Sequence, residues 1–540
     1  MAQIRARVWL DPSGSVYPEL ELPEIAARPS AGLCLSGGGT RAMVAAVGYL
    51  RAFSELGLLD RFRYTSAVSG GSWASIPFTY WRTGARDDRE LLGDLLAPED
   101  LDRTRLQAPL PDSYLASCAA RSFRDNVFDG LTEEGPARAW NSAVGEVFLA
   151  PWGLHDPEAR RSYTWSAATR DAIVARQSDL PGAARLSAED FLLARGGRPF
   201  PIVSAALLGP AGLGRHTRLD LVSYEMTPLY SGILKSTAID YSFEGRAPVH
   251  RRVGGGVIEP FAAGGAGPGW MADAAVQTLT LEHPETFADL AFSIGTSSSA
   301  FATTMTEKLG ASRALSGRVP ALSYWPPRAG DVPRSRPWEL GDGGTLDNYG
   351  LFPLLARGVE TIVVLVNTKE KLGLDWTPGE GSYQGQIDAY LPPLFGVHEP
   401  QPAIALQRNQ VFPREELGSL VSALQDAKRA GGPVMAVREH EVLDNEWLGI
   451  RGGRKVRVAW MLLDRVPRFE ERLPPQTRAM IGLGNQSAGA GPFGEFPNYK
   501  TIGANPWSLV RLEPEQIRLL AALCSWSVMD QRRVLGELLG

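Results

Sequence analysis

One stretch, residues 33–73, constrains the fold of this 540-residue chain more than any other. A short apolar run is followed by three consecutive glycines at 37–39, and then by apolar residues spaced four and three apart. The run predicts a buried strand, and the spacing predicts a helix with one apolar face. A second strand over 63–68 leads straight into Ser69, which two glycines follow. We therefore expect a strand–helix–strand unit with a glycine loop after the first strand and a serine after the second.

Ser69 has the setting of a nucleophile. A hydroxyl at a sharp strand-to-helix turn is held exposed, and the general pattern of such a turn is G-x-S-x-G. Here Ala67 stands at the first glycine position, while Gly71 keeps the last one. A glycine-flanked serine is a weak signal by itself, because ordinary turns share it. The signal becomes stronger when other catalytic motifs follow in the right order.

The glycine loop suits an oxyanion hole. Gly37, Gly38 and Gly39 leave their N–H groups uncovered by side chains, and they precede a helix whose N-terminus favours negative charge. Such donors stabilise the oxygen that becomes negative during acyl transfer. Arg41 follows in the first helical turn, where a cation opposes the helix dipole. We therefore expect Arg41 to face an anion or a carboxylate.

A nucleotide site is the competing interpretation of the same loop. Gly37-x-Gly39-x-x-Ala42 fits the dinucleotide-binding pattern that follows a strand. That site needs an acidic residue at the end of the second strand to hold a ribose. Asp60 precedes the second strand and Ser69 occupies its end, so the sequence favours the nucleophile.

The pair SGGGTRA and AVSGGSW, one helix and one strand apart, resembles the catalytic core of the patatin-like phospholipase family. The likeness is closest to the cytosolic phospholipase A2 (group IV) branch. The family's second motif, an aspartate followed by glycine, is present far downstream as GDGGTLDNYG, with Asp342 as its aspartate. The resemblance is specific over 33–81 and 338–367 and diffuse elsewhere. It implies an α/β fold of three layers, α/β/α, with a mostly parallel central sheet.

The resemblance also implies a role for each motif residue. Ser69 attacks a fatty-acyl ester, Asp342 is the base of a Ser–Asp dyad, and glycines 37–39 hold the oxyanion. Arg41 lies near the phosphate of the lipid, with an ion pair inside the protein as the alternative. The implied activity is that of a phospholipase A or lysophospholipase, a serine acyl hydrolase that forms an acyl-enzyme. Its substrate is a phospholipid or lysophospholipid, and the chemistry requires neither a cofactor nor a metal.

Several alternatives stay open at this point. Asp347 competes with Asp342 as the base, but it lacks flanking glycines and is expected to hydrogen-bond within its loop. A Ser-His-Asp esterase would need His398 or His440, and the charged residues around His440 suggest a solvated surface. An acyltransferase would use the same acyl-enzyme, and a catalytically silent lipid-binding protein is disfavoured by the intact motifs. A carboxylate base of ordinary pKa would keep activity well below the value of about 6.5 at which histidine titrates.

Composition narrows the location and the partners. The formal charge of −5 and the absence of a basic stripe argue against nucleic-acid binding. Three widely spaced cysteines, with no close pair, are expected in a reducing compartment. No window approaches 18 apolar residues and no signal peptide opens the chain, so we expect a cytoplasmic protein with peripheral membrane contact. The sequence identifies no protein activator.

We expect a single catalytic domain over 1–540. Its core is expected at about 30–81 and 200–370, with a helical insertion at about 82–198 and a C-terminal extension at about 370–540. Further strands are expected at 4–10, 201–208, 217–223, 361–367 and 456–463. Three consecutive serines, 297–299, are expected at the start of a polar helix rather than as nucleophiles.

Overall fold

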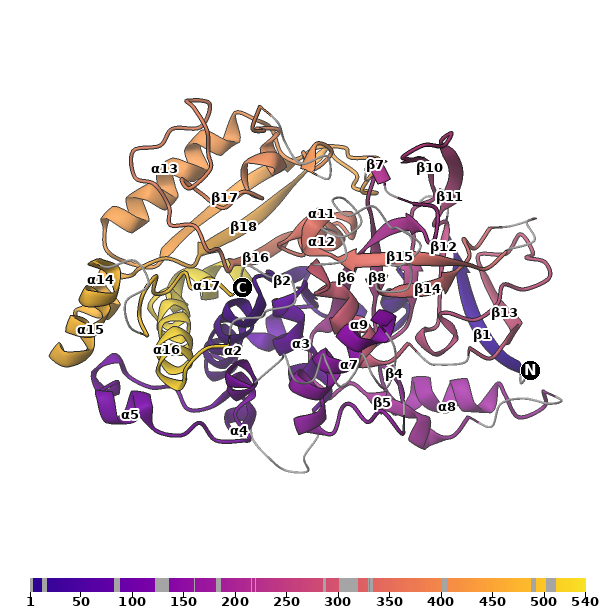
Figure 1. Cartoon of the computed structure of the whole chain (residues 1–540), viewed down its shortest axis with the longest axis horizontal. Coiled ribbons are helices and arrows are strands. Elements are labelled where there is room, and N and C mark those ends of the chain that lie inside the picture. The colour runs from indigo at the N-terminus through magenta and orange to yellow at the C-terminus, as the bar shows by residue number, and fades with distance from the viewer. Residues whose placement is uncertain are drawn as a thin grey trace.

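The computed structural model describes residues 3–11, 17–81, 88–121, 136–159, 161–180, 186–214, 216–218, 220–284, 288–300, 319–328, 330, 334–400, 406–486, 492–501 and 511–540. Within these residues one sheet of thirteen strands runs through the molecule (Figure 1). Its strands are β1 (Gln3–Leu10), β2 (Ala31–Leu35), β3 (Tyr64–Ala67), β6 (Phe200–Pro210), β8 (Val222–Met226), β9 (Ser231–Ile233), β12 (Gly256–Ile258), β13 (Val276–Glu282), β14 (Ala321–Tyr324), β15 (Arg336–Asp342), β16 (Thr361–Val366), β17 (Val434–Val442) and β18 (Arg454–Leu462).

The centre of the sheet is parallel and its flanks are antiparallel. Strands β6, β3, β2, β16 and β18 lie side by side in parallel pairs. Outside them, β8, β9, β12, β1 and β13 on one flank and β17 on the other pair antiparallel. The mostly parallel arrangement expected from the sequence therefore holds for the five central strands, while the whole sheet is mixed. Short connections such as that between β8 and β9 join antiparallel neighbours, whereas parallel neighbours need a crossover.

Helices cover the sheet on both faces, which gives the expected three layers. They are α1 (Pro23–Ala26), α2 (Gly39–Glu55), α3 (Gly70–Tyr80), α4 (Asp88–Leu92), α5 (Arg103–Gln107), α7 (Pro136–Phe148), α8 (Ala167–Ala175), α9 (Leu290–Ser297), α11 (Gly344–Asp347), α12 (Phe352–Ala356), α13 (Glu416–Arg429), α14 (Pro467–Glu470), α15 (Pro475–Gln486), α16 (Pro514–Asp530) and α17 (Arg532–Leu539). In Figure 1, α2, α3 and α16 lie below the central strands, and α12 and α13 lie above them.

The central strands are buried on both faces. Every residue of β2, β6 and β16 is buried, as parallel strands between two helical layers should be. Glycines allow the helices to approach closely. A Cβ at Gly32 of β2 would lie 2.5 Å from a methyl of Leu354 in α12, and one at Gly48 of α2 would lie 2.4 Å from the carbonyl oxygen of Ala521 in α16.

Both ends of the described chain contribute to this core. Strand β1 lies between β13 and β12, and β18 extends the parallel centre next to β16. The described part of 82–198 holds four α-helices and a small parallel pair, β4 (Ser162–Thr164) with β5 (Phe191–Leu193). The division into core, insertion and extension stays a prediction, but β17 and β18 show that the C-terminal part builds the sheet itself.

One expected strand forms two. In place of a strand over 217–223, the chain forms β7 (His216–Arg218) and then β8. Strand β7 pairs with β10 (Thr237–Phe243), which also pairs with β11 (Val249–Val253), so these three make a separate sheet. Apolar periodicity does not show that a run changes from one sheet to another, which explains the difference.

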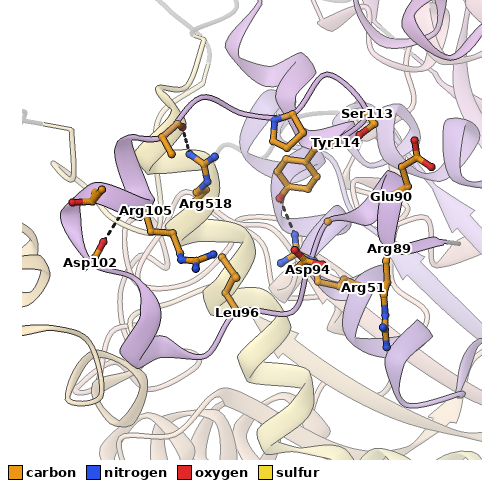
Figure 2. Close-up of a pocket in the computed structure, with 14 residues that line it drawn as sticks. Arg51, Arg89, Glu90, Asp94, Leu96, Asp102, Arg105, Ser113, Tyr114 and Arg518 are labelled. Atoms are coloured by element: carbon orange, nitrogen blue, oxygen red, sulfur yellow. Dashed lines mark hydrogen bonds between the residues drawn. The ribbon is translucent and has the colours of Figure 1, made fainter.

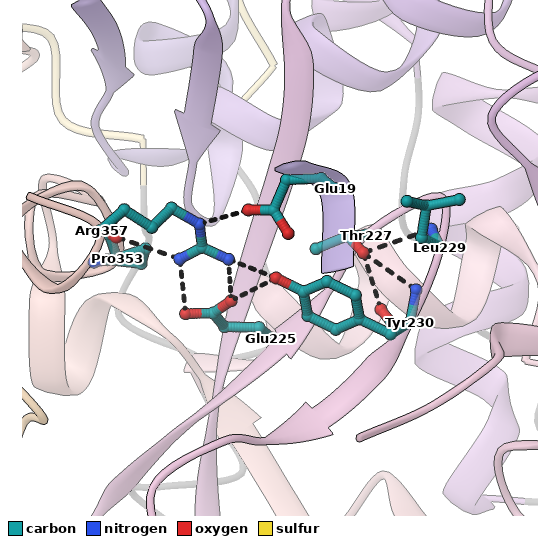
Figure 3. Close-up of polar contacts among 7 residues, drawn as sticks. All are labelled: Glu19, Glu225, Thr227, Leu229, Tyr230, Pro353 and Arg357. Carbon is teal, nitrogen blue, oxygen red and sulfur yellow. Dashed lines mark hydrogen bonds and ion pairs between the residues drawn. The ribbon is translucent and has the colours of Figure 1, made fainter. Parts of the chain in front are cut away.

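A buried ion-pair network ties three segments together beside the central strands (Figure 3). Arg357, just after α12, donates from Nε to Glu19 at 2.7 Å and from both terminal nitrogens to Glu225 of β8, at 3.1 and 2.6 Å. It also donates to the Tyr230 hydroxyl and lies 4.5 Å from the centre of the Tyr17 ring. The carboxylates raise the pKa of Arg357 against the effect of burial. The network fixes α12, and with it the chain that follows Asp342.

Among the described residues, no helix has both the length and the hydropathy that crossing a bilayer requires.

Candidate active site

The site forms where two strands meet end to end along one edge of β6. Strand β3 pairs with β6 up to Ala67, which lies opposite Val203. Strand β15 arrives from the opposite direction and ends at Asp342, opposite Ala205. Strand β8 occupies the other edge of β6 at these residues, so β3 and β15 share a single edge. The residues that follow β3 therefore meet the last residue of β15.

Ser69 occupies a strained turn between β3 and α3. Its φ of 51° and ψ of −130° lie outside the regions that residues with side chains prefer. Its Oγ donates to Oδ2 of Asp342 at 3.0 Å, and its N–H donates to Oγ of Ser297 at 3.0 Å. Ser69 is 8% exposed, and Asp342 is buried as well. The two residues that the sequence predicted as nucleophile and base are thus in direct contact.

Asp342 is held at both oxygens. Oδ1 accepts the N–H of Gly344 at 2.7 Å, while Oδ2 accepts the hydroxyl of Ser69. Burial raises the pKa of Asp342 to about 7, although the hydrogen bonds from Gly344 and Ser69 lower it. A carboxyl with that pKa can both take up and release a proton near neutral pH. The activity at low pH that a carboxylate of ordinary pKa would give is therefore not expected here, and the burial that raises the pKa is not visible in the sequence.

The glycine loop offers two free donors rather than three. The N–H of Gly37 donates to the main-chain carbonyl of Asn348 at 2.9 Å, so in this conformation it is not available to an oxyanion. The N–H groups of Gly38 and Gly39 make no hydrogen bond with any described residue. The loop lies against the nucleophile, since a Cβ at Gly37 would be 3.0 Å from the Cβ of Ser69. The sequence could not show that the Gly37 N–H is already paired, because its acceptor, Asn348, lies some 310 residues downstream.

Arg41 points into the protein. Its Nε and Nη2 donate to the carbonyl oxygen of Asn367 at 3.2 and 2.9 Å, and Nη1 donates to the carbonyl of Tyr499. Burial lowers the pKa of Arg41 to about 10, which still leaves it charged at neutral pH. Its side chain braces the glycine loop, because a Cβ at Gly38 would lie 2.6 Å from Nη2. Arg41 thus has a structural role inside the protein, but its partners are main-chain carbonyls rather than the carboxylate of an ion pair, and its contact with phosphate stays a prediction.

Ser297 is a site residue that sequence reasoning missed. Its hydroxyl accepts the N–H of Ser69 and donates to the carbonyl of Ser204 in β6 at 2.7 Å. Its own carbonyl accepts the N–H of Gly343 at 3.2 Å, next to Asp342. Ser297 is the last residue of α9, which begins at Leu290 with Asp289 as its cap. Ser298 and Ser299 follow it, and the chain is helical again at Ala300, so the helix expected from these serines lies mostly outside the described residues. The sequence showed only three consecutive serines, and this pattern does not indicate that one of them contacts Ser69.

Asp347, the competing candidate for the base, forms its hydrogen bonds with groups other than Ser69. Asp347 accepts the N–H groups of Tyr349, Gly350 and Phe352, at 3.1, 3.0 and 2.7 Å, which confirms that it hydrogen-bonds within its loop. Burial raises its pKa to about 6, and these hydrogen bonds lower it.

Neither candidate histidine contacts Ser69 or Asp342. His440 bonds Glu416 through Nδ1 at 2.6 Å and accepts the indole N–H of Trp460 through Nε2 at 3.0 Å. It is buried on β17, so the expectation of a solvated surface is wrong: the charged neighbours alternate with it along a strand. Both ring nitrogens are thereby engaged with groups other than the pair. No hydrogen bond joins His398 to either residue among those described.

Within the described part of the chain, no group of three or more His, Cys, Asp or Glu side chains is arranged to hold a metal ion.

Comparison with known proteins finds a family match over the first half of the candidate site. Residues 33–190 match the family model of the patatin-like phospholipases. The match contains the glycine loop and Ser69 but ends well before Asp342. Asp342 lies outside this match, so its proposed role rests on its sequence motif and on its contact with Ser69.

Two mouse proteins are similar to parts of the chain. Cytosolic phospholipase A2 zeta from Mus musculus is 53% identical over 122 residues, which are 22% of this chain and 12% of that protein. Cytosolic phospholipase A2 delta from Mus musculus is 38% identical over 90 residues, which are 16% of this chain and 10% of that protein. The matched segments thus span about a tenth of the length of these relatives. Among solved structures, human GIVD cytosolic phospholipase A2 aligns with 98% of this chain and 61% of its own, at 15% identity and a TM-score of 0.43.

Proposed function

We propose that this chain hydrolyses fatty-acyl esters of phospholipids or lysophospholipids through a Ser69–Asp342 dyad. The observation that carries the proposal is the 3.0 Å hydrogen bond from the Ser69 hydroxyl to Asp342, at a strained turn beside a loop with two free N–H groups. The patatin-like match over 33–190 and the phospholipase A2 names of the mouse relatives support the substrate class.

Acylation begins with attack by Ser69. Its Oγ forms a bond to the ester carbonyl carbon while its proton passes to Oδ2 of Asp342. The carbonyl oxygen becomes negative and accepts the N–H groups of Gly38 and Gly39, each worth about 3–4 kcal/mol to the transition state by analogy with other oxyanion donors. Collapse of this intermediate breaks the ester C–O bond. The departing alkoxide takes the proton from Asp342, and the acyl group remains on Ser69.

Deacylation reverses these roles. A water molecule attacks the acyl carbon and gives a proton to Asp342, and the free fatty acid leaves as Ser69 recovers the proton. The pKa of about 7 for Asp342 suits both transfers near neutral pH, since the group is neither always ionised nor always protonated. A hydrogen bond from Gly344 keeps the carboxylate oriented in both steps.

The proposal includes a cytoplasmic location with peripheral contact to membranes. The three cysteines, Cys34, Cys118 and Cys524, are all free and buried, which suits a reducing compartment. Because the proposed substrates reside in bilayers, the protein must meet a lipid surface during turnover.

Product analysis tests the function. The purified protein is incubated with phosphatidylcholine and lysophosphatidylcholine that carry a labelled acyl chain, and with an alcohol as acceptor. We expect labelled free fatty acid from the wild type and none from Ser69→Ala. Ser298→Ala is the matched control, because its hydroxyl donates only to carbonyls of its own helix. Label on the alcohol in excess of fatty acid would identify an acyltransferase, and release of neither product would refute the proposal.

A further inference from the structure

A hollow of about 680 Å³ lies at the far end of α2 from the proposed site. It is bordered by α2, α4, α5 and α16 and by the turn that contains Tyr114 (Figure 2). Arg51 reaches it from α2, twelve residues after Gly39, which is roughly 18 Å along the helix axis. The hollow is therefore distinct from the Ser69–Asp342 site.

Arg51 brings a buried charge to the wall of the hollow. The residue is 4% exposed, and its Nε donates to the carbonyl of Leu92 at 2.8 Å while Nη2 donates to the Tyr114 hydroxyl at 2.9 Å. Both acceptors are neutral, and no described carboxylate forms an ion pair with Arg51. A buried cation without a counter-charge is unfavourable, because it has lost hydration without gaining an opposite charge.

Two further arginines lie across the hollow from Arg51 (Figure 2). Arg518 of α16 donates to the carbonyls of Leu106 and Pro109 and makes no ion pair among the described residues. Burial and the nearby charge of Arg105 lower the pKa of Arg518. The guanidinium of Arg105 itself has no hydrogen-bond or ion-pair partner in the described part of the chain. Three positive groups thus face one space without a negative partner of their own.

The carboxylates around the hollow do not offset this charge. Asp102 caps α5 by accepting the N–H of Arg105 at 2.7 Å. The fourth arginine, Arg89, is paired with Glu55 at 2.8 Å. Glu90 is half-buried, and Asp94 is exposed to solvent. Asp102 therefore serves its own helix, and Glu90 and Asp94 line the hollow without an ion pair to Arg51, Arg105 or Arg518 among the described residues.

We propose that this hollow binds a ligand through a phosphate monoester group. Guanidinium groups present paired N–H donors that match the oxygens of a phosphate, and several of them together favour a doubly charged anion. The Tyr114 hydroxyl accepts from Arg51 and keeps its own hydrogen to donate. The volume exceeds that of a phosphate ion, so the phosphate is expected to carry an organic group. This site is independent of the proposed hydrolysis.

Titration calorimetry tests the proposal with two sources of the group. The probes are glycerol 3-phosphate, which is soluble, and phosphatidylcholine vesicles with and without phosphatidate. We expect saturable binding of at least one source that weakens as salt is added. Arg105→Gln should weaken it about tenfold, since one charged hydrogen-bonding group is lost. Because Arg105 is exposed and has no partner among the described residues, this variant should fold normally.

Two variants serve as controls. Arg103→Gln removes the same charge from the same helix, but Arg103 does not line the hollow and instead contacts Gln107. It should leave the affinity within about twofold. Asp94→Asn should tighten binding, because it removes a negative charge that would repel the phosphate from the lining of the hollow. Binding of phosphatidate vesicles alone, with the same dependence on Arg105, would identify a lipid headgroup. Absence of binding to both sources, or equal weakening by Arg103→Gln and Arg105→Gln, would overturn the proposal.

Discussion

Ser69 keeps a backbone conformation that is unfavourable by itself. A serine at a φ of 51° costs about 1–3 kcal/mol unless its surroundings maintain it. The N–H of Ser69 is held by Ser297, and its side chain is held by Asp342. The two hydrogen bonds offset part of the strain and direct the hydroxyl at the base. Strain of this kind gathers at reactive sites, which is why the turn supports a catalytic interpretation.

The pH dependence of turnover should follow Asp342. Its pKa is raised from 3.8 to about 7, so the carboxyl is protonated below that pH and cannot accept the Ser69 proton. Activity should therefore rise as pH increases through about 7 and be lost as pH falls through it. The measurement is kcat/KM against pH with a soluble ester substrate. Full activity at pH 5 would contradict the raised pKa. Because histidine titrates in the same range, the profile alone does not tell the two bases apart.

Ser297 should act as a positioning residue. Ser297→Ala removes the acceptor for the Ser69 N–H and the donor to Ser204, so the elbow loses one of its restraints. We expect kcat to fall about tenfold with little change in KM, because orientation of the nucleophile is affected more than binding. Ser297→Thr keeps the hydroxyl and should retain activity. Equal losses in both variants, or a change confined to KM, would count against this role.

At the scale of elements, the glycine loop depends on segments that are distant in sequence. Asn348 accepts the Gly37 N–H, Thr501 donates to the Gly38 carbonyl at 2.8 Å, and Arg41 links the start of α2 to the end of β16. The loop is thereby held with the N–H groups of Gly38 and Gly39 unpaired among the described residues. A preformed oxyanion hole needs such support, since donors must be in place before charge develops.

Arg41→Gln distinguishes the two roles considered for this arginine. If Arg41 supports the loop, the variant leaves the carbonyls of Asn367 and Tyr499 unpaired. The free energy of unfolding should then fall by about 1–3 kcal/mol, together with kcat. Denaturant titration measures the free energy of unfolding, and steady-state kinetics measure kcat and KM. A rise in KM for phospholipids with unchanged stability would instead show that Arg41 binds the substrate phosphate.

The local elements of the site were predictable, but their contacts were not. Strands β2, β3 and β16 and helix α2 follow from apolar periodicity. The candidate nucleophile and base were predicted from the motifs around Ser69 and Asp342. What the sequence did not show is which N–H groups stay free, because that depends on Asn348 and Ser297, residues far from the motifs. It also did not show that β3 and β15 meet on one edge of β6.

At the scale of the whole molecule, the network around Arg357 connects the N-terminal segment, β8 and α12. No periodic pattern in the sequence indicates a buried ion pair between residues 19, 225 and 357. Such a network contributes less to stability than its number of hydrogen bonds suggests, since burying three charges removes their hydration. Removing only one charged partner from the network should nevertheless lower the free energy of unfolding markedly.

Arg357→Met should destabilise the protein strongly. The change leaves Glu19 and Glu225 as buried carboxylates without a counter-charge, and breaking a buried pair in this way costs about 3–5 kcal/mol. Thermal and denaturant unfolding measure the effect. Lys455→Gln, which breaks the exposed contact with Glu439, is the control and should leave the midpoint unchanged. A loss no larger than that of the control would mean that the network does not tie these segments together.

The central claim is that Asp342, without a histidine, activates Ser69. The most direct measurement is the rate at which a fluorophosphonate labels the protein, with the labelled residue identified by peptide mass spectrometry. We predict label on Ser69 in the wild type and none on that peptide in Ser69→Ala. The rate should fall about a hundredfold or more in Asp342→Asn, which cannot accept the proton, and should stay near the wild-type value in His440→Ala and His398→Ala. Label on a different residue would contradict the account, as would rapid labelling of Asp342→Asn together with loss of labelling in either folded histidine variant.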